Sequence, residues 1–263
     1  MHPMLNIAIR AVRKGGSILV QNYDNYKTNN KKKIEKQELI TKIIKISEKL
    51  MTNIIHKSYP EHIIITKTTK NVQNAKLKII WLINALDGIN NFKRNLPHFC
   101  VSIAIKIQNI TEISAIYDPL RNELFTAVKG QGAQLNGYRM RCNNINSLKN
   151  SLIGMTYACN KFDVNTNFLK IFNIFLSRDI KLRFTGCLNL DYSYVAIGRL
   201  DFLFNFKIQP FMITAGSLQV KESGGLISDL NGGNNYFASD SVTLIGNAKL
   251  MRTILIKIRN NFK

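Results

Sequence analysis

Hydrophobic residues recur at helical spacing in two stretches near the start of the chain. In the first stretch, one helical stripe would carry Leu5, Ile9, Val12, Gly16 and Leu19. In the second, from about 39 to 57, the stripe would carry Ile40, Ile43, Ile44, Ser47, Leu50, Met51, Ile54 and Ile55. This period predicts two amphipathic helices packed on a core. The polar, basic segment 27–36 between them is expected to be a loop.

Shorter apolar runs follow, and their length and flanking turn residues indicate strands. Strands are expected at 63–66, 79–83, 101–107, 113–117 and 123–128, with turns at Asn109 and at Asp118-Pro119. From about residue 150 strands are expected at 151–156, 181–183, 201–205, 226–228 and 242–244, alternating with helices near 167–176, 189–197, 212–222 and 247–259. The alternation predicts an α/β or α+β protein. We interpret it as one unit with two packed sub-layers, approximately 1–149 and 150–263.

Length and composition are those of a globular protein with a substantial core, since the chain has 263 residues and 45% of them are hydrophobic. No apolar run approaches the roughly 18 residues that a membrane span needs, and the first residues lack the features of a secretory signal. We therefore expect a cytoplasmic protein with no membrane partner. The four cysteines and four histidines show no C-x-x-C pair and no ligand spacing, so neither a zinc site nor a disulfide framework is indicated.

The formal net charge of +21 is large for a chain of this length. Such a charge attracts phosphate polyanions without regard to sequence, which makes nucleic acid a candidate partner. However, Lys, Asn and Ile are frequent along the whole chain, as expected where an AT-rich genome biases the codons. A one-sided basic patch would favour binding and an even spread of lysines would favour compositional drift, so both interpretations stay open here.

The most informative segment is 81–92, an apolar strand that leads into the turn Asp87-Gly88. It resembles the signature W-[VI]-[IV]-D-P-[LI]-D-G-T-x-N-F of the inositol monophosphatase family, whose two aspartates and intervening carbonyl hold Mg²⁺. The likeness covers nearly the whole chain and is strongest to the bacterial SuhB branch, with further matching segments at 1–8, 96–99, 117–125, 130–138 and 215–216. It implies a layered αβαβα sandwich of the inositol-monophosphatase/sugar-phosphatase fold, with 84–88 at the end of a central strand. Gly130-x-Gly132 lacks the βαβ context of a phosphate-binding loop and matches a hairpin of the family instead.

The chemistry that the resemblance implies is Mg²⁺-dependent phosphomonoester hydrolysis, which requires several carboxylates. The family positions for metal binding are Lys67, Asn84, Leu86, Asp87 and Met212, of which Lys67 replaces Glu, and Asn84 and Met212 replace Asp. A further acidic position is Ile44. The family positions for substrate are Gly88, Ile89, Asn90 and Asn205, of which Ile89 replaces Thr and Asn205 replaces Glu. Asp87 opposed by Lys67 gives a nearly neutral site, so we expect no catalytic residue to function, no bound cofactor, and no strong Mg²⁺ binding.

Three apolar replacements, Ile44, Ile89 and Met212, could fill the space that ions and waters occupy in active relatives. Loss of ligands with retention of the fold favours a non-catalytic role. By resemblance to the SuhB branch, that role is a Nus factor that binds NusA and RNA polymerase in ribosomal RNA antitermination and aids ribosomal RNA folding, with ribosomal RNA as a further partner and a homodimer as the expected assembly. One alternative is an inositol-1-phosphate phosphatase with weak residual activity. Another is a phosphate- or nucleotide-sensing module whose cleft has become cationic through Lys67, Lys70, Lys93 and Arg94.

Overall fold

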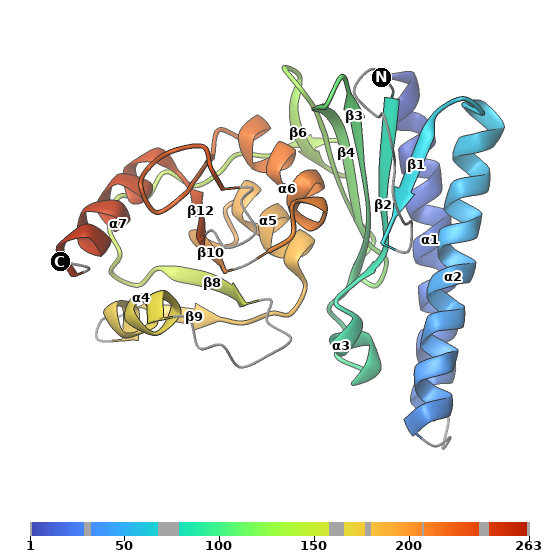
Figure 1. Ribbon diagram of the computed structural model, residues 1–263, viewed down its shortest axis with the longest axis horizontal. Helices are drawn as coiled ribbons and strands as arrows, with labels where there is room; N and C mark the ends of the chain where they lie inside the picture. Colours follow the sequence, from blue (N-terminus) through green and yellow to red (C-terminus); the bar gives the residue numbers. More distant parts are fainter. Residues whose placement is uncertain are drawn as a thin grey trace.

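The chain forms five layers, in the order helices, sheet, helices, sheet, helices (Figure 1). The computed structural model describes residues 2–28, 33–67, 79–157, 166–176, 180–206, 208–236 and 242–261. The two ends of the chain lie on opposite sides of the molecule, in the two outer helical layers. The layered αβαβα sandwich expected from the resemblance is therefore confirmed.

The first outer layer consists of two long helices, α1 (Pro3–Thr28) and α2 (Lys33–Ser58), which lie side by side. They approach closely at Gly15, where an added Cβ would fall 2.6 Å from the Met51 sulfur. There the Ser47 hydroxyl donates a hydrogen bond to the Gly15 carbonyl. The expectation of a loop over 27–36 is wrong at both ends, because the helices include 27–28 and 33–36. Lys, Glu and Gln are good helix formers, so polarity alone did not indicate a loop.

A mixed sheet of seven strands forms the second layer, in the order β1-β2-β3-β4-β5-β6-β7. Its strands are β1 (Ile63–Thr66), β2 (Ile79–Asp87), β3 (Cys100–Ile107), β4 (Ile110–Asp118), β5 (Glu123–Val128), β6 (Gly132–Leu135) and β7 (Tyr138–Arg139). β1 is parallel to β2, and the other pairs are antiparallel. All five strands expected in this half are present. β2 lies next to the edge strand rather than at the centre of the sheet, because the meander after it adds strands on one side only.

The remaining layers come from the second half of the chain. The middle layer contains α5 (Leu188–Ala196) and α6 (Pro210–Glu222), which touch at Gly216, where an added Cβ would fall 2.4 Å from the Tyr192 Cβ. The second sheet has the order β11-β12-β10-β8-β9, with β8 (Leu152–Tyr157), β9 (Lys181–Arg183), β10 (Phe202–Phe206), β11 (Leu226–Ser228) and β12 (Val242–Gly246). α4 (Thr166–Leu176) and α7 (Ala248–Asn261) lie on its outer face. The expected alternation of strands and helices is confirmed.

Three buried apolar clusters hold these layers together. The first joins α1 and α2 to the seven-stranded sheet, the second joins that sheet to α5 and α6, and the third joins the second sheet to α4 and α7. Ile44 and Ile89 pack at the border of the first cluster and Met212 at the border of the second. Within the described ranges, no helix combines the length and apolar character needed to cross a membrane.

Candidate functional site

The family signature lies where β2 ends and the short helix α3 (Ile89–Lys93) begins. Asn84 pairs with Ser102 and Asp87 with Cys100, so β2 carries one more residue than β3 between these pairs and forms a bulge. The chain then turns at Gly88, whose φ of 85° is left-handed. An added Cβ there would lie 2.8 Å from the His98 carbonyl oxygen, so the turn requires glycine. This geometry directs Asp87 toward the middle helical layer.

Asp87 connects the first sheet to the start of α5. One carboxylate oxygen accepts a hydrogen bond from the Gly88 N–H at 3.0 Å. The other accepts two from Asn189, from the backbone N–H at 2.7 Å and from the side-chain amide at 2.9 Å. Cys187, the residue before the first turn of α5, makes no side-chain capping bond. Asp87 therefore supplies the acceptor and the negative charge that a helix N-terminus favours.

Two buried amides occupy positions where the resemblance expects carboxylates. Asn84 is buried, and its Nδ2 has no hydrogen-bond partner in the part of the chain that the structure describes. Asn205 on β10 donates to the Tyr192 hydroxyl at 2.9 Å, while its Oδ1 has no such partner in the same part. An amide NH2 group cannot ligate a cation, and an amide oxygen can ligate one but brings no negative charge. These side chains therefore keep the polarity of the family site without its charge.

The other family positions come from other elements of the fold. Lys67 is exposed in the turn directly after Thr66, which pairs with Ile83 of β2, so Lys67 lies beside the strand end that carries Asn84. Met212 is half-buried on α6 at the border of an apolar cluster. Asn90 and Arg94 are exposed, Lys93 is half-buried, and Lys70 lies outside the described residues. The structure therefore brings Asn84, Leu86, Asp87, Gly88 and Ile89 together along one strand end and turn, with Lys67 in the neighbouring turn. Asp87 and Asn205 each bond to α5, Asp87 at Asn189 and Asn205 at Tyr192.

Two cysteines that are distant in the sequence meet beside Asp87. The sulfur atoms of Cys100 and Cys187 are 3.6 Å apart, and both residues are fully buried. Burial raises the pKa of the Cys100 thiol to about 11 and that of the Cys187 thiol well above its usual value. Both are therefore neutral thiols at neutral pH. The absence of a C-x-x-C motif gave no signal of this pair, because 86 residues separate the two cysteines.

The residues at this site do not fit a Mg²⁺ cluster. Mg²⁺ requires an octahedron of oxygen ligands, usually including carboxylates. Among the described family metal positions Asp87 alone carries a carboxylate, and its oxygens already accept three N–H bonds. Among the described His, Cys, Asp and Glu side chains, the ligand atoms that lie within 4.8 Å of an Asp87 oxygen and of one another are the Cys100 and Cys187 sulfurs. Thiols are soft ligands that Mg²⁺ disfavours.

A buried carboxyl group that sequence reasoning missed lies on the same helix. Asp191 accepts hydrogen bonds from the Thr185 hydroxyl at 2.7 Å and the Thr156 hydroxyl at 3.3 Å. Burial, together with the negative charge of Asp87, raises the pKa of Asp191 to about 7, although the threonine bonds oppose the shift. An Asp within the apolar segment 188–196 was the available signal in the sequence. Its bonds connect α5 to the second sheet.

The hairpin that contains Gly130 and Gly132 is also accounted for. The backbone N–H groups of both glycines donate to the Glu222 carboxylate at the end of α6, at 2.9 and 2.8 Å. In a phosphate-binding loop such N–H groups would donate to the phosphate. Here they donate to Glu222 instead. The segment is the turn between β5 and β6.

Known proteins resemble this chain over its whole length. The model of the inositol monophosphatase family matches residues 1–262. The chain belongs to the inositol monophosphatase family. It is 60% identical to a protein named Nus factor SuhB from Buchnera aphidicola subsp. Baizongia pistaciae (strain Bp), over 100% of this chain and 98% of that relative. It is 38% identical to the Nus factor SuhB of Escherichia coli (strain K12), over 99% and 97% of the two chains.

A solved structure agrees with these relatives. The crystal structure of the extragenic suppressor protein SuhB from Bartonella henselae superposes with a TM-score of 0.85 at 26% identity, covering 98% of this chain and all of that one. The sequence signature predicted membership of the inositol monophosphatase family and a likeness to the SuhB branch, and both predictions are therefore confirmed.

Proposed function

We propose that this chain is a SuhB-like Nus factor that works by binding and not by hydrolysis. Its partners in this proposal are NusA and RNA polymerase in the complex that makes ribosomal RNA transcription processive, with ribosomal RNA as a further partner whose folding it aids. The names of the relatives support the general role. The proposal that the chain does not hydrolyse phosphate rests on Asp87, whose carboxylate accepts two hydrogen bonds from Asn189 at the start of α5.

Two features support a loss of turnover. Lys67 places a cation, and Met212 an apolar side chain, where the resemblance expects acidic ligands. Removing ions that stabilise a phosphoryl transition state lowers the rate about tenfold for each 1.4 kcal/mol lost. The protein in this proposal therefore needs no metal cofactor.

We also propose that the chain forms a homodimer. Leu96 and Phe184 each have 54% of their surface exposed. The segments that carry them are joined by Asn91, whose side-chain amide donates to the carbonyls of His98 and Thr185, each at 2.8 Å. Exposed apolar side chains on adjoining segments are typical of an interface between subunits.

The experiment combines retention of NusA with an assay of phosphate release. Purified chain is immobilised and incubated with NusA at low and high salt, with and without a chelator of divalent cations. We expect retention that is independent of the chelator and decreases as salt rises, because charged contacts are screened. The same preparation should release no phosphate from inositol 1-phosphate above background at millimolar Mg²⁺.

Two outcomes would contradict the proposal. One is failure to retain NusA even at low salt. The other is Mg²⁺-dependent phosphate release at a rate comparable with that of an active family member, which would favour the alternative of an inositol-1-phosphate phosphatase.

A further inference from the structure

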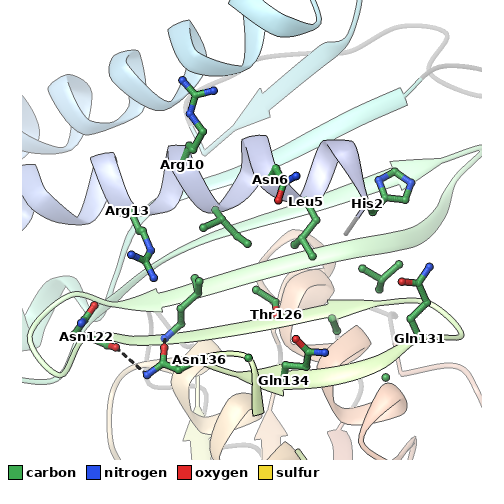
Figure 2. Close-up of a pocket in the computed structure, with 16 residues that line it drawn as sticks. His2, Leu5, Asn6, Arg10, Arg13, Asn122, Thr126, Gln131, Gln134 and Asn136 are labelled. Carbon is green, nitrogen blue, oxygen red and sulfur yellow. Dashed lines mark hydrogen bonds between the residues drawn. The ribbon is translucent and has the colours of Figure 1, made fainter. Parts of the chain in front are cut away.

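A groove of about 860 Å³ lies between the first half of α1 and the strands β5 and β6 (Figure 2). α1 packs on β2, β3 and β4, and the sheet continues beyond the helix to β5 and β6. The groove opens where the helix no longer covers the sheet. None of its lining residues is a family metal or substrate position, so the groove is distinct from the site around Asp87.

The floor of the groove is apolar apart from one hydroxyl group. Alternate residues of β5, Leu124, Thr126 and Val128, face α1, and Leu5 and Ile9 face them from the helix. Thr126 has only 7% of its surface exposed. Its hydroxyl makes no hydrogen bond within the described ranges and is not fully buried, so a molecule in the groove can reach it. The side chain lies at the centre of the groove in Figure 2.

The walls of the groove carry five carboxamide side chains, from Asn6, Asn122, Gln131, Gln134 and Asn136. Asn122 accepts from the Tyr117 hydroxyl, and Asn136 donates to the Asn122 carbonyl, so these two are engaged. The amides of Asn6, Gln131 and Gln134 make no hydrogen bond to any residue that the structure describes. Each offers both a donor and an acceptor to a bound molecule.

The charge of the groove is positive. Arg13 extends from α1 toward Asn122 and Asn136, whereas Arg10 turns toward α2 (Figure 2). No Asp or Glu is among the described residues that line the groove. At the opposite end, the His2 Nδ1 accepts a hydrogen bond from the Met4 N–H, so a neutral His2 ring carries its proton on Nε2 and can donate it.

We propose that this groove binds a nucleoside 5′-phosphate, either free or as one unit of a single-stranded RNA. The phosphate lies at Arg13, whose planar guanidinium suits that group. The ribose and base lie along the apolar floor, with Thr126 within reach of a ribose hydroxyl. The free carboxamides pair with the edge of the base, as Asn and Gln do with adenine. A single cation beside several neutral amides suits a base and one phosphate better than an acidic peptide, and the volume is that of a small-molecule pocket.

The test is calorimetric titration of the full chain with AMP, GMP, CMP and UMP at fixed salt, with adenosine and inorganic phosphate as partial ligands. We expect at least one nucleoside monophosphate to bind with one site per chain, and each partial ligand to bind about tenfold more weakly or worse. Arg13→Gln should weaken binding about tenfold or more, since a bond to a charged group is lost. Thr126→Val and Gln134→Leu should each weaken it several-fold.

The matched control is Lys14→Gln, which removes the same charge from the neighbouring position of α1 but does not line this groove. We expect it to leave the affinity unchanged, with thermal unfolding showing that every variant is folded. A short single-stranded RNA that competes with the monophosphate identifies RNA as the source of the unit, and one that does not compete identifies the free nucleotide. The proposal is overturned by the absence of saturable binding, by equal weakening in Lys14→Gln and Arg13→Gln, or by an acidic peptide that binds where no nucleotide does.

Discussion

The Asp87 carboxylate accepts hydrogen bonds from both the backbone and the side chain of Asn189, at 2.7 and 2.9 Å. Asn189 lies in the first turn of α5, whereas Asp87 ends a strand of the first sheet. The family uses the position of Asp87 for a metal ligand. In this chain the same carboxylate stabilises the contact between two layers of the fold.

Asp87→Ala is expected to lower the free energy of unfolding by about 2–4 kcal/mol, because it leaves buried N–H donors of Gly88 and Asn189 without an acceptor. Urea unfolding followed by circular dichroism measures the change. The control is Glu112→Ala, which removes a carboxylate that pairs with the exposed Lys129 and should cost less than about 1 kcal/mol. A loss no larger for Asp87→Ala than for Glu112→Ala would contradict the structural role.

Restoring three carboxylates together, with Lys67→Glu, Asn84→Asp and Met212→Asp, is expected to recover measurable Mg²⁺ affinity. Each single reversal should do little, because a metal site is assembled by its ligands jointly. Calorimetric titration with Mg²⁺, alongside phosphate release from inositol 1-phosphate, provides the measurement. Strong Mg²⁺ binding by the unaltered chain would show that the present ligands suffice.

Asp191 is expected to make stability depend on pH. Its pKa is about 7 in the folded chain and about 3.9 in an unfolded one. Between these values the folded carboxyl keeps a proton that the unfolded one has lost, so the free energy of unfolding falls as pH rises from about 4 to about 7. Asp191→Asn should remove this dependence and stabilise the chain at pH 8, by up to roughly 4 kcal/mol.

Denaturant unfolding of both proteins across that pH range checks the prediction for Asp191. The amide can still accept a bond from Thr185 and donate one to Thr156, so the hydrogen-bonding pattern is retained. Equal destabilisation of Asp191→Asn at every pH would indicate that the carboxylate is charged in the folded chain.

Gly216→Ala is expected to destabilise the contact between α5 and α6. The new Cβ would meet the Cβ of Tyr192 at 2.4 Å, and neither backbone can move without disturbing a buried cluster. Overpacking of this kind typically costs 1–3 kcal/mol, which thermal unfolding would measure as a lower midpoint. An unchanged or higher midpoint would show that the two helices can separate at little cost.

Much of the fold could be predicted because its signals are local. The period of Leu5, Val12 and Leu19 indicated α1, and the apolar runs indicated the strands. The two ends of the segment 27–36 were misjudged because charged side chains occur both in loops and on exposed helix faces. The position of β2 beside an edge depended on which strands pair, and that information does not lie within the strand itself.

The candidate site was predictable only as far as the resemblance extended. The signature identified Asn84 and Asp87, and the replaced residues indicated a weak metal site. It could not indicate that Asp87 supports α5, because its partner Asn189 is 102 residues away. The Cys100–Cys187 contact could not be predicted for the same reason. The groove that contains Arg13 forms only because the fold brings α1 next to the strands β5 and β6.

Helix α5 has polar bonds in several directions: Asn189 to the first sheet, Asp191 and Tyr192 to the second, and Ser193 to Gln219 on α6. If any one of these layers separated, α5 would lose the hydrogen bonds that hold it in place, and its bonds to the remaining layers would weaken as well. The consequence is cooperativity: the chain should unfold in a single transition, with the short middle helix and the two sheets losing their structure together. Selection for that cooperativity would preserve Asp87 irrespective of catalysis.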